Sequence, residues 1–116
     1  MIHADNSEFF RKLMRTFLTE HGYPVESSNS GKQVLDAVNA GKISLVVTGM
    51  TLSDMDGDEL IKKVVTSRYK VPIIAVTSND SEEQRQVLKA LGVKATVSKN
   101  GSWQEELLPL LTESMK

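Results

Sequence analysis

The sequence predicts an α/β fold with three layers, in which five parallel strands alternate with five helices. Short apolar segments alternate with segments of helical apolar periodicity along the whole chain. Two of the short segments are almost entirely apolar, which is typical of strands covered by helices on both faces. This order requires right-handed crossovers and therefore a parallel sheet. With 116 residues, the chain is predicted to form one domain over 1–116, either alone or as part of a longer protein.

The N-terminal region begins with a predicted strand over residues 1–4, followed by the most clearly periodic helix of the chain. Ser7 is a suitable N-cap for this helix, and Gly22 fits the left-handed residue just beyond its end. A weaker second strand is expected over 23–26, where a proline restricts it to a position that needs no N–H donor. The helix is expected to bury one face made of Phe9, Phe10, Leu13, Met14, Phe17 and Leu18.

In the middle of the chain, Ser30 can open a second helix that closes near Gly41. The apolar run 43–47 predicts the third strand, and a loop follows over 48–56. A third helix then leads to a second buried strand over 71–76. The residues expected to face the core from these two helices are Val34, Leu35, Val38, Leu60, Ile61, Val64 and Val65.

The C-terminal region is predicted to contain a fourth helix, capped by Ser81 and ended by Gly92. A last strand over 95–97 and a last helix over 102–115 follow. Pro109 falls inside that helix, where it removes one backbone hydrogen bond and should kink or shorten the helix. The fourth helix is expected to bury Val87, Leu88 and Leu91.

Composition excludes several classes of function. The formal net charge of −1 gives no basic face for nucleic acid and no reason to expect a membrane partner. The chain has no cysteine, so disulfides and thiolate metal sites are absent. No apolar run approaches the roughly 20 residues of a membrane helix, and no signal-peptide pattern is present. We therefore expect a cytoplasmic location.

The functional crevice of such a fold lies outside the carboxyl ends of its strands, near the switch point in strand order. Polar residues at the ends of the predicted strands are therefore the candidates for the site. They fall in four segments, which are Asp5-Asn6-Ser7, Thr48-Gly49-Met50, Thr77-Ser78 and Ser98-Lys99-Asn100.

These segments resemble the receiver domain of response regulators, and the resemblance covers essentially the whole chain. The family has acidic residues after its first strand, here Asp5 and Asn6, and a Pro-x-Met-Asp-Gly loop, here residues 53–57. Its fourth strand ends in Thr or Ser, matched by Thr77, and its fifth ends in Lys, matched by Lys99. The resemblance implies a flavodoxin-like sheet with strand order 2-1-3-4-5.

The phosphoacceptor aspartate of the family lies eight residues before the glycine of that loop, and this position is Gly49. Glycine has no side-chain oxygen, so acyl-phosphate chemistry at this position is absent. The neighbouring Thr48 points to the opposite face of its strand and is no simple substitute. Of the three acidic positions that hold Mg²⁺ in the family, only Asp5 is charged, because Asn6 and Gly49 are neutral. No metal site is therefore predicted, and Mg²⁺ binding should be absent or very weak.

The remaining charges suggest a different use of the pocket. Asp5 and Lys99 sum to zero, so we hypothesise that they pair directly and give each buried charge a partner. Thr77 is retained, but the aromatic switch position of the family, three residues before Lys99, is Thr96. With neither phosphate nor aromatic rotor, we expect one locked conformation.

Other residues have weaker claims to a function. The acidic loop of Asp54, Asp56 and Asp58 lacks a calcium-binding pattern and is interpreted as a solvated turn; a substitute phosphoacceptor there is the disfavoured alternative. The two histidines, at 3 and 21, are isolated and expected to take no part in metal or acid–base chemistry. Trp103 is expected to pack against the domain while remaining partly exposed. The alternative is that it belongs to a partner surface, because receiver-like domains commonly bind partners through this region.

We expect a signalling module that is not an enzyme and has no catalytic residue or cofactor. It would act by phosphorylation-independent binding to a protein such as a sensor kinase, a phosphotransfer protein or an effector domain. A homodimer is a further alternative. Two alternatives remain. One is a phosphoaccepting regulator that uses an unusual residue, and the other is a small-ligand-binding α/β domain with its site in the emptied crevice.

Overall fold

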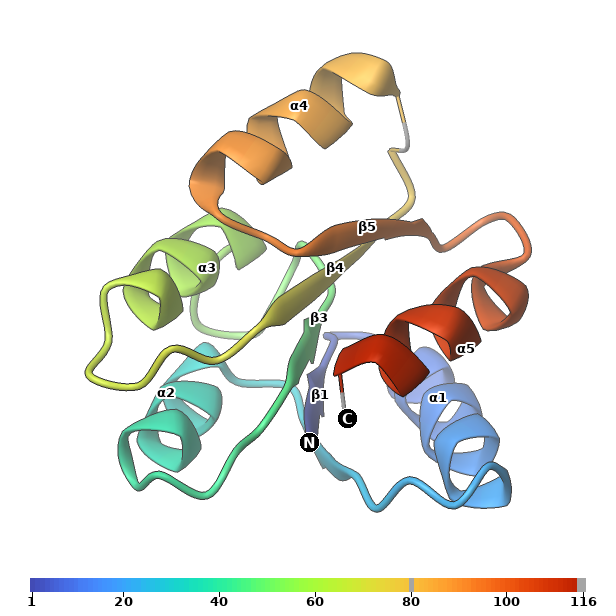
Figure 1. The fold of residues 1–116 in the computed structure, drawn as a ribbon, viewed down its shortest axis with the longest axis horizontal. Coiled ribbons are helices and arrows are strands. Elements are labelled where there is room, and N and C mark those ends of the chain that lie inside the picture. The colour runs from blue at the N-terminus through green and yellow to red at the C-terminus, as the bar shows by residue number, and fades with distance from the viewer. Residues whose placement is uncertain (80, 115–116) are drawn as a thin grey trace.

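The computed structural model describes residues 1–79 and 81–114, and these form one five-stranded parallel sheet between two layers of helices (Figure 1). The strand order is β2-β1-β3-β4-β5, which confirms the predicted fold class and order. The elements are β1 Ile2–Ala4, α1 Glu8–Glu20, β2 Glu26–Ser28, α2 Gly31–Asn39, β3 Val46–Thr48, α3 Gly57–Val65, β4 Ile73–Thr77, α4 Glu82–Leu91, β5 Ala95–Ser98 and α5 Trp103–Ser114. Among the described residues, no helix is long and apolar enough to cross a membrane.

Two apolar cores lie on the two faces of the sheet. Helices α1 and α5 cover one face, and α2, α3 and α4 cover the other (Figure 1). Strands β3 and β4 contribute to both cores, because alternate side chains point to opposite faces. The apolar runs predicted as doubly covered strands overlap β3 and β4 at the centre of the sheet, although these strands begin at Val46 and Ile73, later than the predicted starts at 43 and 71.

The predicted helix starts are confirmed by their capping bonds. The hydroxyls of Ser7, Ser30 and Ser81 each accept a hydrogen bond from the backbone N–H three residues later. At the other end, Gly22 and Gly92 have φ of +82° and +113°, as predicted for left-handed residues that end a helix.

The second strand is displaced from its predicted position. It spans Glu26–Ser28 and not 23–26, because the preceding residues are still needed to leave α1. The amides of Gly22 and Tyr23 bond to carbonyls near the end of that helix, and the chain first reaches β1 where Glu26 N–H donates to Met1 O at 3.0 Å. A strand at the edge of a sheet tolerates the polar serines found there.

Several apolar residues predicted to be buried are exposed. On α1 the core-facing strip is narrow and consists of Phe10, Met14 and Leu18, four residues apart, so Phe9 is 74% exposed. The i, i+3, i+4 spacing predicted a wider buried face, but α1 contacts the sheet along one strip only. The other predicted core residues found exposed are Leu13, Val65 and Val87.

Pro109 does not shorten the last helix, contrary to one of its two expected effects. Helix α5 continues from Trp103 to Ser114, and its predicted end at Met115 lies outside the described residues. Pro109 lies on the exposed face, while Leu107 and Leu111 on either side are buried. Core packing thus offsets the single lost hydrogen bond.

Candidate functional site

Asp5 lies just past the carboxyl end of β1, and its carboxylate has two bonded partners. One oxygen accepts from the backbone N–H of Ser7 at 2.8 Å, and the other accepts from Lys99 Nζ at 2.9 Å. The residue is almost fully buried. The predicted Asp5–Lys99 ion pair is therefore confirmed, across 94 residues of sequence.

Lys99 is fixed at the carboxyl end of β5 by its backbone and its side chain. Its N–H donates to Thr77 O at 2.8 Å, which joins it to the end of β4. Its ammonium lies 4.5 Å from the centre of the Phe10 ring, in a cation–π contact, as well as against Asp5. The positive charge therefore has two favourable contacts within the domain.

Gly49 follows β3 directly and lies against Asp5. Its N–H donates to Ala4 O at 2.7 Å, so the backbone is held close to β1. A Cβ atom built on Gly49 would lie 2.5 Å from Asp5 Oδ2, which is closer than real Cβ contacts allow. The carboxylate of Asp5 thus takes the space that a side chain at position 49 would need.

The neighbouring hydroxyls are also engaged. Thr48 is fully buried, and its hydroxyl donates to Gly49 O at 2.8 Å. The Thr77 hydroxyl accepts from Asn79 N–H at 3.0 Å and donates to Asn79 O at 3.2 Å, which ties it to the loop after β4. Both threonines therefore satisfy their hydroxyls locally.

A crevice of about 280 Å³ opens at this edge of the sheet. Four of the five residues predicted for the pocket line it, with Gly49 beside it and the Asn6 side chain exposed. Thr96 is not part of the crevice: it lines a separate groove with Arg85, whose Nη1 donates to Thr96 O at 2.9 Å. The crevice is lined by Asp5, Asn6, Ser7, Met50, Thr51, Val76, Thr77, Ser78 and Lys99.

Asp54 has a structural role that the sequence did not indicate. Its carboxylate caps α2 from a distant loop, accepting from the N–H groups of Gly31 and Lys32 at 2.8 and 3.0 Å and from the Ser30 hydroxyl at 3.0 Å. The bonds from Gly31 and Lys32 hold the pKa of this carboxyl below its usual value. The predicted solvated turn is exposed, but this residue is fixed. Because the bonded groups are 22 to 24 residues away, no local pattern could have revealed them.

His3 is a second residue whose buried environment the sequence did not indicate. Its side chain is fully buried in β1, and neither ring nitrogen has a hydrogen-bond partner. The ring packs against Phe10, with 5.8 Å between ring centres. Burial lowers the pKa of His3 to about 4, so the imidazole is neutral near pH 7.

Trp103 is a core residue, which corrects its predicted partial exposure. It is 6% exposed, and its ring centre lies 5.2 Å from those of both Phe10 and Phe17. It therefore holds α5 against α1. In this position little of the ring is free to anchor a partner.

Comparison with known proteins places these features in a family context. The family model described as the response regulator receiver domain matches residues 1–111. The sensor histidine kinase RcsC of Escherichia coli strain K12 is 26% identical over 96 residues, which cover 83% of this chain and 10% of that protein. The transcriptional regulatory protein GlrR of the same strain is 30% identical over 78 residues, or 67% of this chain and 18% of that protein. The chain thus spans less than a fifth of either relative.

Solved structures show the same architecture. The chemotaxis response regulator CheY4 of Vibrio cholerae superimposes with a TM-score of 0.85 at 25% identity, covering 97% of this chain and 95% of that chain. The receiver domain of the Francisella response regulator 1452 gives a TM-score of 0.89 at 21% identity, covering 97% and 93%. The second likeness shows the fold alone.

Proposed function

Because the chain belongs to the response regulator receiver domain family, we propose that it is a two-component signalling module that binds a protein partner without being phosphorylated. It has no catalytic role of its own in this proposal. Its place would be in the cytoplasm, where the partner is a sensor kinase, a phosphotransfer protein or an effector domain. The relatives include both a sensor kinase and a transcriptional regulator, so receiver domains of this kind occur in both settings.

The Asp5–Lys99 ion pair carries the proposal. Phosphoryl transfer needs a nucleophile, a metal ion and a cation aimed at the developing charge. Gly49 supplies no nucleophile, and the ammonium of Lys99 is already bonded to Asp5 at 2.9 Å. The groups that would serve a phosphoryl group are therefore absent or neutralised within the domain.

The donor set of the crevice does not fit Mg²⁺. This ion prefers one or two free carboxylates together with waters and phosphate. The single carboxylate, Asp5, already accepts bonds from Ser7 and Lys99, and Asn6 offers a neutral amide. Among the described residues, no three His, Asp or Glu side chains come together as a ligand group.

The switch residues support one conformation. The hydroxyl of Thr77 is bonded to Asn79, and Thr96 replaces the aromatic residue that the family uses as an indicator. A module in one state can still transmit a signal, because its partner can change in abundance or in its own state. Binding rather than switching is therefore the proposed output.

Intact mass spectrometry tests the proposal directly. The chain is incubated with acetyl phosphate and Mg²⁺, alongside a receiver domain that has the phosphoacceptor aspartate. We expect a phosphoryl adduct on the control and none on this chain. An adduct on this chain would overturn the proposal in favour of a phosphoaccepting regulator with an unusual residue.

A second candidate function rests on the crevice of about 280 Å³ beside Lys99. Asn6, Thr51 and Ser78 supply polar side chains there, so a small polar ligand could bind in place of a phosphoryl group. A thermal-shift screen against nucleotides and metabolites tests this candidate. A saturable rise in Tm that is lost in Lys99→Met would favour ligand binding at the crevice.

A further inference from the structure

A second concave surface lies at the opposite end of the sheet from the crevice. Residues just before β4 and residues at the ends of α3 and α4 enclose a groove of about 430 Å³, which we call the α3–β4 groove. Val71 and Pro72 directly precede β4, so this groove lies at the amino end of that strand, whereas Thr77 lies at its carboxyl end. The groove is lined by Val64, Val65, Lys70, Val71, Pro72 and Gly92.

The lining of the groove is mostly apolar, and part of it faces solvent. Val65 is 49% exposed, and the nearby Tyr69 is 38% exposed. Gly92 keeps the space beside Val65 open, because a Cβ on Gly92 would lie 2.9 Å from Val65 Cγ2. Apolar side chains exposed in a concave setting are typical of a binding surface.

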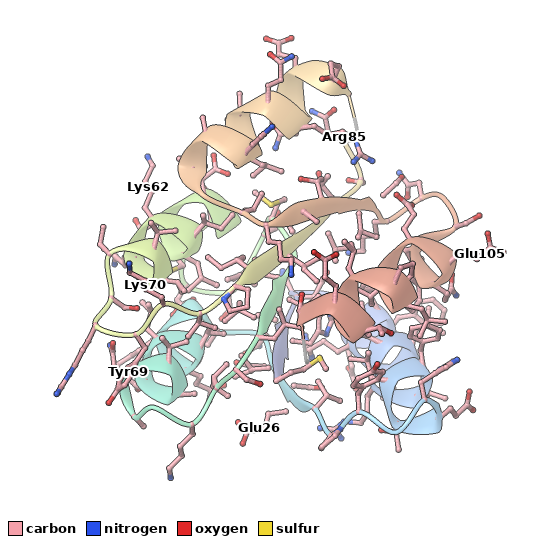
Figure 2. The ribbon with its side chains drawn as sticks, in the orientation of Figure 1. Glu26, Lys62, Tyr69, Lys70, Arg85 and Glu105 are labelled. Atoms are coloured by element: carbon pink, nitrogen blue, oxygen red, sulfur yellow. The ribbon has the colours of Figure 1, made fainter. Side chains whose placement is uncertain are left out.

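The same region has an excess of positive charge. Residues 60–79 contain four Lys and Arg residues and no Asp or Glu. Glu59 pairs with Lys63 at 3.5 Å, but within the described ranges 1–79 and 81–114, Lys62, Arg68 and Lys70 form no ion pair. Figure 2 shows Lys62, Tyr69 and Lys70 on one side of the molecule, around α3 and the loop that leads to β4.

Helix chemistry explains only part of this charge. Lys62 and Lys63 lie in the last turn of α3, where cations are favoured by the helix dipole. Arg68 and Lys70 lie in the loop, where the dipole of α3 gives no such reason. Lysines on other helices, such as Lys12 and Lys32, pair with acids four residues away.

We propose that the α3–β4 groove binds an acidic protein segment that inserts apolar side chains. The valines and Pro72 would receive the apolar residues. Lys70 in the lining, together with Lys62 on α3 and Arg68 in the adjoining loop, would attract the carboxylates. This inference deepens the proposed function, because it rests on the chain acting by protein binding and names the chemistry of the partner.

The shape and chemistry of the groove favour a protein segment over other occupants. A bilayer surface is flat and suits protruding apolar side chains, whereas this apolar surface is concave. Single-stranded nucleic acid needs several aromatic platforms, whereas the lining consists of valines, proline, glycine and one lysine, and the nearby Tyr69 offers a single ring. A helix with apolar residues on one face fits such a groove in many known complexes.

The probe is a dye-labelled synthetic helical peptide with leucines on one face and glutamates elsewhere. A matched peptide has lysine in place of each glutamate. We expect the acidic peptide to bind in fluorescence anisotropy, with affinity falling as salt rises, and the basic peptide not to bind. In methyl NMR spectra, the shifts should concentrate at Val64, Val65 and Val71.

Two variants locate the site. Lys62→Glu/Lys70→Glu should weaken binding by about tenfold or more, since it reverses one charge in the groove lining and one on α3. Val65→Ser should weaken it several-fold through lost apolar contact. The matched control is Lys12→Glu/Lys32→Glu, which makes the same change of net charge on other faces and should leave affinity within about twofold. All these side chains are exposed, and circular dichroism verifies that the variants fold.

Several results would overturn the inference. One is the absence of acidic-peptide binding, and another is equal binding by both charge-reversal variants. Binding of phosphatidylserine-containing vesicles that depends on Lys62 and Lys70, without peptide binding, would assign the surface to a membrane. Self-association abolished by Lys62→Glu/Lys70→Glu would assign it to a second copy. A phosphoryl adduct on the chain would sink the proposed function but would leave the peptide result unchanged, so the two failures can be distinguished.

Discussion

The lysines near the two ends of β4 differ in whether their charge is paired within the domain. In the crevice at the carboxyl end, Lys99 is bonded to Asp5 at 2.9 Å and rests on the ring of Phe10. At the α3–β4 groove, Lys62 and Lys70 have no ion pair among the described residues and stand beside exposed apolar side chains. The comparison shows that the lysine at the family's site has its charge paired within the domain, whereas Lys62 and Lys70 are available to an outside partner.

His3 should give the largest effect, because burial strongly lowers the pKa of its imidazole. Its pKa is 6.5 when unfolded and about 4 when folded, so the folded state binds fewer protons between these values. Its contribution is therefore fully present above pH 6.5 and is lost as pH falls toward 4, by about 3 kcal/mol. Urea unfolding at a series of pH values measures this.

The control for that measurement is His3→Leu, which fills similar space without a titratable group. The difference between the two proteins isolates His3 from the carboxyl groups that titrate in the same range. Parallel stability curves from pH 7 to pH 4 would show that His3 finds a proton-accepting partner or water in solution.

The next effect compares the two kinds of lysine. Lys99→Met should cost about 2 kcal/mol, less than for a fully buried pair because the Lys99 side chain is 28% exposed. Lys62→Met should change the free energy of unfolding by less than about 0.5 kcal/mol, because Lys62 is exposed and forms no ion pair with any residue that the structure describes. Denaturant titration of both variants measures the two changes in the free energy of unfolding. Similar changes would contradict the proposed difference between Lys99 and Lys62.

Gly49→Ala should cost about 1 to 2 kcal/mol, because the new methyl group must displace the Asp5 carboxylate. In an Asp5→Ala background the same substitution should cost much less, since the obstructing carboxylate is gone. A double-mutant cycle by urea unfolding measures the coupling. If Gly49→Ala costs the same in both backgrounds, Asp5 does not fill the space at position 49.

Gly49→Asp should fail to restore efficient phosphorylation, because Asn6 is still neutral at a position that holds Mg²⁺ in the family.

The smallest effect is expected at Asp54, which lies outside both ends of the comparison. Asp54→Ala removes the acceptor for the N–H groups of Gly31 and Lys32 and should lower Tm slightly. Asp56→Ala in the same loop is the matched control, since its side chain makes no capping hydrogen bond. Equal Tm values for the two variants would show that the cap is not populated in solution.

Apolar periodicity predicted the fold well for the elements that depend on local sequence alone. The doubly covered strands β3 and β4 and the serine caps followed from local patterns. The exposure of Phe9 could not be predicted, because the width of a buried helix face depends on how closely neighbouring helices approach. The start of β2 depends on how many residues the exit from α1 consumes, which sequence spacing does not reveal.

The predictions for the candidate site divide in the same way, into those that the sequence supported and those that depend on tertiary contacts. Asp5 and Lys99 were predicted as partners from a charge count, and the structure joins them. The roles of Asp54 and Trp103 depend on contacts between distant segments, and no local pattern encodes those. The α3–β4 groove was missed because Val65 matched a core position and its exposure is a tertiary property.

A magnesium titration followed by amide NMR tests the central claim most directly, namely that the crevice satisfies its own charges and needs no metal or phosphoryl group. The amide signals of Asp5, Ser7, Gly49 and Lys99 report on the crevice, and those of Lys62 and Lys70 serve as the internal reference. We predict no specific shift at Asp5, because its carboxylate already has two bonded partners. A saturable shift there with submillimolar affinity would contradict the account.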